Sequence, residues 1–174
     1  MQEALDLMQQ DPEFCYFFDT ASEFLSAVEL RLGARLEELK ERIRQGRVRL
    51  VSGQVSNCRP TQVGDETFIR NLQLGREYFE SRFPPTDLSL FHSVDIAIGG
   101  VQMPQILSQA GLKAYRAWRP HGPLNALGIP HQFIWQGIDG SRILVTRGSY
   151  SGWFGDSPVN HEESTWDEIV AWAY

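Results

Sequence analysis

The chain has 174 residues, of which 42% are hydrophobic and 11% aromatic, a composition that supports a packed core and excludes intrinsic disorder. Its 16 Lys and Arg stand against 22 Asp and Glu, giving a formal charge of −6, so we expect no nucleic-acid partner. We find neither an apolar run of about 18 residues nor a leader sequence, so we expect no membrane span. The two cysteines form no disulfide framework, so we expect a reduced, cytoplasmic location.

The first part of the chain alternates a short apolar run with helical periodicity. Residues 14–18 are apolar and of strand length. Thr20 and Glu23 form a capping box, and apolar residues at steps of three or four then predict one long helix that ends at Gly46. The segment Val48–Val55 predicts the next strand.

The second part repeats this alternation. Asp65 is the predicted N-cap of a helix that Pro84 and Pro85 end. Leu88–Val94 predicts a third strand that ends at Asp95. The remaining predicted elements are a helix from Pro104 to Gly111 and strands at 114–118, 133–135 and 143–146.

Strands that alternate with helices indicate β-α-β units and a parallel sheet covered on both faces. In such folds the chemistry lies at the carboxyl ends of the strands. Asp19, Asp95 and Arg119 follow three predicted strands, and Tyr150 follows the last one. We therefore expect polar side chains to gather at one edge of the sheet.

Both ends of the chain predict an incomplete domain. Gln2–Met8 resembles the end of a helix without its start, and a helix that opens at Ser164 reaches Tyr174 without a stop signal. A closed eight-unit barrel needs about 250 residues. We therefore expect residues 1–174 to be part of a single (β/α)-barrel domain, about half of the barrel and truncated at both ends.

Asp95 has two interpretations. It follows an apolar strand and precedes the pair Gly99-Gly100, a place where a carboxylate can act as a nucleophile, a general base or a metal ligand. An Asp that caps the next helix or orders the loop explains the same position. His92 lies three residues before Asp95, so in an alternating strand it points to the opposite face, and we expect a structural role for it.

The neighbouring candidates are also open to two interpretations. Trp118 and Arg119 end the fourth predicted strand, and an Arg offers planar donors to carboxylates or sugar hydroxyls, or forms an ion pair with a nearby acid. Tyr150 and Trp153 lie in a loop rich in Gly and Ser, where aromatic rings stack on a sugar face or pack at a rim.

Five stretches of the chain follow one another in a specific order and spacing. They are Gly46-Arg47 with VSGQV at 51–55; Glu66 and Arg70 with Gly75, Tyr78 and Phe79; Asp95 with Pro104 nine residues later in the segment MPQIL; Arg119; and Phe133 and Trp135 with Asp139-Gly140-Ser141. Together they resemble the catalytic N-terminal domain of the glycoside hydrolase family 38 α-mannosidases, over roughly residues 12–150. The chain departs from the family pattern at Gln54 and His92, where the family has Trp, and at Ala97-Ile98, where it has Phe-Gly.

The resemblance implies a (β/α)7-type barrel that hydrolyses terminal α-mannosides with retention. It makes Asp95 the nucleophile and a zinc ligand, and it makes Arg119 a substrate-binding residue, to which we add Trp118 and Tyr150. The expected cofactor is zinc, whose other ligands fall outside this chain together with the general acid. The expected partner is a mannoside or oligosaccharide, and homo-oligomerisation stays open.

Two other functions compete with this one. A non-catalytic carbohydrate-binding pseudoenzyme of the same descent would explain the altered loop after Asp95. A metal-dependent polysaccharide deacetylase-like enzyme shares the broken-barrel architecture but needs a metal triad, which the sequence does not show.

Overall fold

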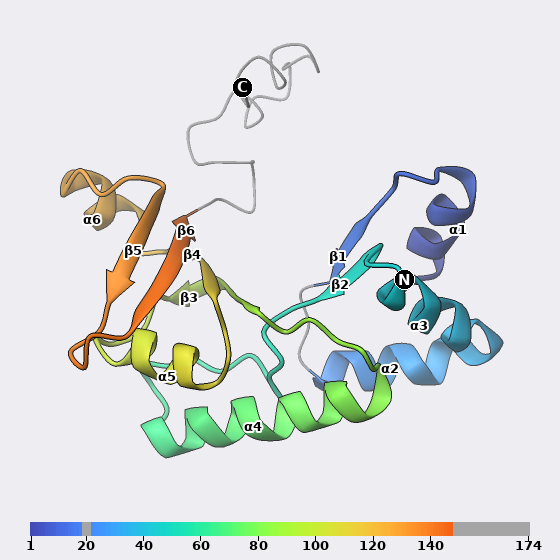
Figure 1. The fold of residues 1–174 in the computed structure, drawn as a ribbon, viewed down its shortest axis with the longest axis horizontal. Helices are drawn as coiled ribbons and strands as arrows, with labels where there is room; N and C mark the ends of the chain where they lie inside the picture. Colours follow the sequence, from blue (N-terminus) through green and yellow to red (C-terminus); the bar gives the residue numbers. More distant parts are fainter. Residues whose placement is uncertain (19–21, 148–174) are drawn as a thin grey trace, which may run out of the picture.

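The computed structural model describes residues 1–18 and 22–147 as two sheets that rest on a shared helix (Figure 1). The six strands are β1 (Tyr16–Phe18), β2 (Val48–Leu50), β3 (Leu90–Ala97), β4 (Ala114–Arg119), β5 (Gln132–Gln136) and β6 (Arg142–Arg147). The helices are α1 (Gln2–Gln10), α2 (Ser22–Leu32), the 3-10 helix η1 (Gly33–Arg35), α3 (Leu36–Arg44), α4 (Asp65–Arg82), α5 (Met103–Gln109) and α6 (His121–Ala126).

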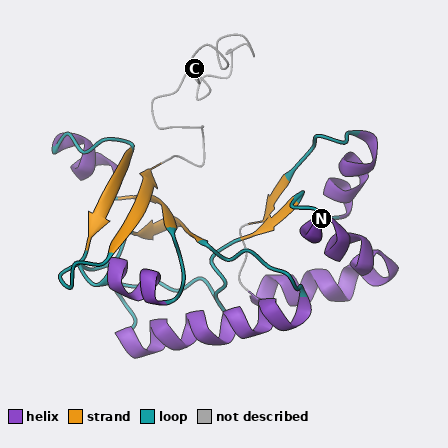
Figure 2. Cartoon of the chain, viewed as in Figure 1, coloured by secondary structure: helices purple, strands orange, loops and turns teal. Residues whose placement is uncertain are grey.

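The expected α/β fold with parallel strands is confirmed. β1 pairs with β2 in parallel, and the second sheet has the order β3-β4-β6-β5, in which β3, β4 and β6 run parallel (Figure 2). β5 is the exception, because a tight turn at Asp139 and Gly140 joins it to β6 as an antiparallel hairpin.

The apolar side chains form two cores that α4 connects. Phe79 of α4 and Phe83, which caps the end of this helix, pack in the core beneath β1 and β2, together with α1 and α3. Phe68 and Leu72, from the first half of α4, pack beneath the four-stranded sheet together with α5. One helix therefore supports both sheets along its length (Figure 1).

Gly75 lies between the two halves of α4, where the helix crosses the segment after β2. A Cβ at Gly75 would lie 2.3 Å from the carbonyl oxygen of Gly53 and 2.4 Å from the carbonyl carbon of Gln54. These atoms belong to the backbone and cannot rotate away, so only glycine allows this close approach.

One face of the four-stranded sheet is partly exposed within the described residues, which corrects the expectation of helices on both faces. Pairing across the strands aligns Leu90, Ala114, Leu144 and Ile134 in a single row on this face, which we call the apolar row of the inner face. Leu144 is 43% exposed and Ile134 57% exposed. Side chains of the other face, such as Phe91 and Tyr115, pack in the core beneath α4 and α5.

The strands do not close into a barrel in the part of the chain that the structure describes. The expected half barrel therefore corresponds here to an open arrangement of two sheets, and the closed (β/α)7-type barrel stays a prediction for a longer domain.

Left-handed backbone explains two boundaries that the sequence placed wrongly. The single long helix is divided into α2 and α3 by η1, which begins at Gly33 with φ +54°. The strand predicted over 48–55 ends at Leu50, because Ser52 and Gly53 have φ of +67° and +62° and cannot continue a strand.

Two further differences concern the ends of elements, and a third is a helix that the sequence did not predict. Gly64 rather than Asp65 is the N-cap of α4, and Asp65 is the first helical residue, where its charge suits the helix dipole. β3 continues to Ala97, so Asp95 lies inside the strand rather than after it. The short helix α6 was not predicted.

Among the helices of residues 1–18 and 22–147, none combines the length and apolar composition that a membrane crossing needs.

We predict that Gly75→Ala lowers the free energy of unfolding by about 1–3 kcal/mol, because the added methyl group meets fixed backbone. Urea denaturation measures this change. The matched control is Gly122→Ala, where a Cβ meets nothing within 4 Å and φ is not left-handed. Equal stability of the two variants would contradict the tight crossing at Gly75.

Candidate functional site

The carboxyl ends of parallel strands bring Asp95 and Arg119 to the same edge of the sheet. Ala97 of β3 pairs with Arg119, the last residue of β4, and the Ile98 amide donates to the Arg119 carbonyl at 3.0 Å. Asp95 lies two residues before Ala97 on the neighbouring strand. The carboxyl edge of the sheet, where we expect the chemistry, is therefore formed in part by the ends of β3 and β4, which carry Asp95 and Arg119.

The β3 backbone around Asp95 is irregular. Ser93 pairs with Ala117 and Ala97 pairs with Arg119, so four residue steps on β3 match two on β4. Irregularities of this kind include β-bulges, which bend a strand, re-aim its side chains and are common beside active sites. The irregularity at Asp95 is therefore consistent with a functional segment, and the sequence did not predict it.

The other predicted site residues have different positions. Trp118 is the penultimate residue of β4, and the exposed Arg119 follows it. Tyr150 and Trp153 lie outside the described residues, as do Asp19 and the helix predicted from Ser164. The roles of Asp95, Arg119, Trp118 and Tyr150 all stay predictions.

Ser52, which follows β2, forms hydrogen bonds with the backbone of β3. The His92 amide donates to Ser52 Oγ at 2.9 Å, and the same hydroxyl donates to the His92 carbonyl at 3.0 Å. The Ser52 amide donates to the Leu90 carbonyl at 2.9 Å. Ser52 is fully buried and has φ +67°, a conformation that costs free energy in any residue with a side chain. These contacts hold the two sheets together near the start of β3.

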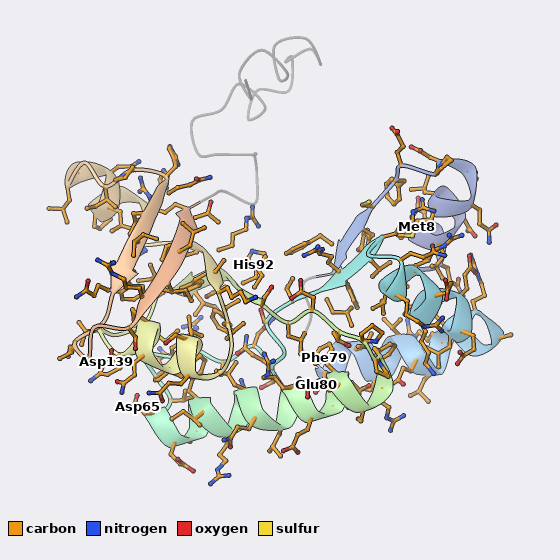
Figure 3. All side chains as sticks on the ribbon, in the orientation of Figure 1. Met8, Asp65, Phe79, Glu80, His92 and Asp139 are labelled. Atoms are coloured by element: carbon orange, nitrogen blue, oxygen red, sulfur yellow. The ribbon has the colours of Figure 1, made fainter. Side chains whose placement is uncertain are left out.

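His92 contacts residues of two other strands. Its ring is 7% exposed, and Figure 3 shows it in the region between the two sheets. Arg116 Nη1 lies 2.9 Å from His92 Nε2, and because a guanidinium only donates, Nε2 is the acceptor. The edge of the Phe17 ring meets the His92 ring with centroids 5.8 Å apart. The expected structural role of His92 is thus supported by contacts on both sides of its ring.

Strand pairing places a polar row directly above the apolar row. His92 pairs with Arg116, Arg116 with Thr146, and Thr146 with Gln132. These four residues form the polar row of the inner face, and they lie two residues nearer the carboxyl ends of β3, β4 and β6 than the apolar row. Arg116, Thr146 and Gln132 were not predicted from the sequence, because their alignment with His92 depends on the register between strands.

The loop after β2 is held by a buried amide network. Asn71 Nδ2 of α4 donates to Gln54 Oε1 at 3.0 Å and to the Ser56 carbonyl at 2.9 Å. The Cys58 thiol lies in the same network, and burial raises the pKa of this thiol, which keeps it protonated at neutral pH. A cavity of about 30 Å³, lined in part by Gln54, Cys58 and His92, adjoins the loop and is too small for a sugar.

Arg147 is a buried cation with a structural role. It donates to the Pro130 carbonyl at 3.1 Å, to Asn125 Oδ1 at 2.8 Å and to the Ile129 carbonyl. It is 2% exposed, and these oxygens satisfy it at the carboxyl end of β6. Arg147 therefore fixes the loop between α6 and β5 beside the candidate site.

The described residues do not by themselves form a zinc site. Across residues 1–18 and 22–147, no three His, Cys, Asp or Glu side chains gather as ligands. A zinc site normally needs at least three protein ligands, so Asp95 would need partners from elsewhere. A hollow of about 840 Å³ lies between α4 and α5.

Comparison with known proteins identifies the family. The sequence profile described as "Glycosyl hydrolases family 38 N-terminal domain" matches residues 1–167. The chain belongs to glycoside hydrolase family 38. The family resemblance seen in the five sequence stretches is thereby confirmed.

Relatives and solved structures agree with this membership. The chain is 28% identical over 142 residues to alpha-mannosidase 2C1 of Homo sapiens, covering 82% of this chain and 14% of that protein. A crystal structure of an alpha-mannosidase from Enterococcus faecalis V583 superposes with a TM-score of 0.73 at 19% identity, covering 98% of this chain and 19% of that chain. The 4-alpha-glucanotransferase of Thermococcus litoralis shares the fold with a TM-score of 0.71 at 13% identity, over 85% of this chain and 23% of that chain. The family 38 chain thus spans about one seventh of the length of its human relative.

We predict that Ser52→Ala lowers the free energy of unfolding by about 1–3 kcal/mol, because two buried backbone groups of His92 lose their partner. Alanine keeps the same backbone preference, so the change isolates the hydroxyl. Chemical denaturation measures the loss. Ser108→Ala, which removes a hydroxyl bonded to Gln105 on α5, is the control and should change stability by less than about 0.5 kcal/mol.

Proposed function

We propose that the chain is part of the catalytic domain of a retaining α-mannosidase, with Asp95 as the nucleophile. The observation that carries the proposal is the position of Asp95 and Arg119 at one carboxyl edge of a family 38 sheet, with an irregular strand register around Asp95. Family membership supports a mannosidase-type glycosidase, and the strand register supports the choice of edge.

Retention requires two carboxyl groups about 5–5.5 Å apart. In the proposed first step, an Asp95 carboxylate oxygen forms a bond to the anomeric carbon while the bond from that carbon to the leaving oxygen breaks. A second carboxylic acid protonates the leaving oxygen. Water then attacks the anomeric carbon and releases Asp95, with the second group acting as the base. The resemblance places that second group outside residues 1–174.

Arg119, Trp118 and Tyr150 are the proposed substrate contacts. Arg119 offers planar N–H donors to the hydroxyls of the sugar, and Trp118 and Tyr150 offer aromatic faces on which the ring can stack. The exposed position of Arg119 at the end of β4 is compatible with this role.

Zinc is proposed for the complete domain, where it would hold hydroxyls of the sugar. The described residues do not complete its ligand set, so no step above depends on the metal. The exposure of Leu144 and Ile134 on the inner face has an explanation in the same proposal: further strands of the barrel domain would cover these two side chains. A cytoplasmic location and a neutral mannoside substrate remain parts of the proposal.

A carbohydrate-binding pseudoenzyme is the second candidate. It is favoured by the altered loop after Asp95, where Ala97-Ile98 replace the family's Phe-Gly, and by His92 and Gln54, which stand where the family has Trp. Binding of a mannoside without turnover would distinguish this function from the enzyme.

We predict that Asp95→Ala in the full-length protein reduces release of p-nitrophenol from p-nitrophenyl α-mannoside by about a thousandfold or more, because the glycosyl-enzyme cannot form. The far-ultraviolet circular dichroism spectrum should be unchanged. The control is Asp87→Ala, which removes an exposed carboxylate paired with Arg49 and should keep wild-type turnover. Wild-type turnover by Asp95→Ala would remove Asp95 from the nucleophile role.

A further inference from the structure

We propose that Tyr115 is a positioning residue for Asp95, because its hydroxyl holds the backbone of Ile98 just after the strand that carries Asp95. The inference rests on the proposed function, since it assigns a further residue to the same reaction. Tyr115 lies in β4, and its hydroxyl donates to the Ile98 carbonyl at 3.2 Å. None of the five stretches that resemble family 38 contains Tyr115, so the assignment comes from this contact.

Ile98 is fixed at both of its backbone polar groups. Its amide donates to the Arg119 carbonyl at 3.0 Å, and its carbonyl accepts from Tyr115. Its side chain packs against the core beneath the four-stranded sheet. Both hydrogen bonds lead to β4, so the chain just after β3 is tied to the neighbouring strand. The peptide units on the two sides of Ile98 therefore have fixed orientations.

The Tyr115 ring is itself held in one place. It is fully buried, and the Phe91 ring of β3 meets it in an edge-to-face contact with centroids 5.1 Å apart. Strand pairing aligns Tyr115 with Phe91 on one side and with Val145 on the other. Because packing locks the ring, the hydroxyl is presented to Ile98 at a defined position.

The Tyr115 hydroxyl is a permanent donor in this contact. A carbonyl oxygen only accepts, so the phenol must supply the proton of the hydrogen bond. Burial raises the pKa of the Tyr115 phenol, which therefore stays protonated at neutral pH. The Ser93 side chain of β3 has a smaller and opposite effect on this pKa, so its hydroxyl lies beside the phenol.

The contacts of Tyr115 with β3 and the following loop lie on both sides of Asp95. Phe91 is four residues before Asp95, and Ile98 is three residues after it. Between these points the register is irregular, and an irregular ladder lacks some of the hydrogen bonds that normally fix a strand. A misplacement of about 1 Å at a reacting group can cost about a hundredfold in rate. We therefore expect the Tyr115 hydroxyl to act on kcat rather than on binding of the sugar.

The test compares Tyr115→Phe with Tyr78→Phe in the full-length protein. Both changes remove only a phenolic hydroxyl that donates to an oxygen, but Tyr78 lies on α4 and donates to Glu29 of α2. With p-nitrophenyl α-mannoside, Tyr115→Phe should lower kcat about ten- to a hundredfold and keep KM within about twofold of wild type. Tyr78→Phe should keep wild-type kcat at a temperature at which both variants are folded.

Hydrogen exchange followed by mass spectrometry provides a local measurement that a general loss of stability would not reproduce. The peptide that covers residues 96–100 should exchange faster in Tyr115→Phe than in the wild-type protein, and at the wild-type rate in Tyr78→Phe. Incorporation of 4-aminophenylalanine at position 115 restores a donor to the Ile98 carbonyl and should recover most of the lost kcat. If Tyr115→Phe does not fold, 4-methylphenylalanine replaces it, since this residue fills the space of the hydroxyl and donates nothing.

The outcomes separate this proposal from the proposed function. Wild-type kcat in Tyr115→Phe, unchanged exchange at residues 96–100, or an equal loss of kcat in Tyr78→Phe would overturn the role of Tyr115. A wild-type protein that hydrolyses no α-mannoside would contradict the proposed hydrolase. The exchange comparison would then decide alone whether Tyr115 holds the segment: faster exchange would support the contact, and unchanged exchange would overturn it.

Discussion

The architecture depends on the contact between the Ser52 hydroxyl and the backbone of His92. This hydroxyl both accepts from and donates to His92, across the boundary between a two-stranded and a four-stranded sheet. The left-handed backbone of Ser52 ends β2 and turns the chain so that the contact can form. The hydroxyl adds two hydrogen bonds to the one that the Ser52 amide donates to the Leu90 carbonyl, and it fixes the backbone of His92, whose ring contacts Phe17 and Arg116.

The second constraint is the shared helix beneath both sheets. α4 contributes Phe68 to one core and Phe79 to the other, and Gly75 lets it approach the loop after β2 closely. Because that loop also carries Ser52, the helix and the hydroxyl contact support each other. Residues far apart in the sequence are thereby held at one edge, which is what a glycosidase site on strand ends requires.

The sequence predicted the alternation of strands and helices and the family. Hydrophobic periodicity and the spacing from Asp95 to Pro104 were sufficient for these, because they depend on local pattern. The end of β2 was missed, because Ser52 adopts a left-handed conformation that its residue type does not signal. The irregular register on β3 around Asp95 was missed as well. The polar row was missed for another reason, since the alignment of His92 with Arg116 is set by register between strands.

The central claim is that Asp95, presented by this scaffold, forms a covalent bond to the sugar. Its most direct test is incubation of the full-length protein with a fluorinated α-mannosyl fluoride, which forms a glycosyl-enzyme that hydrolyses slowly, followed by peptide mass spectrometry. The account predicts one fluorinated hexosyl group on the peptide that contains Asp95. A label on a different carboxylate, or unlabelled protein that still hydrolyses mannosides, would contradict it.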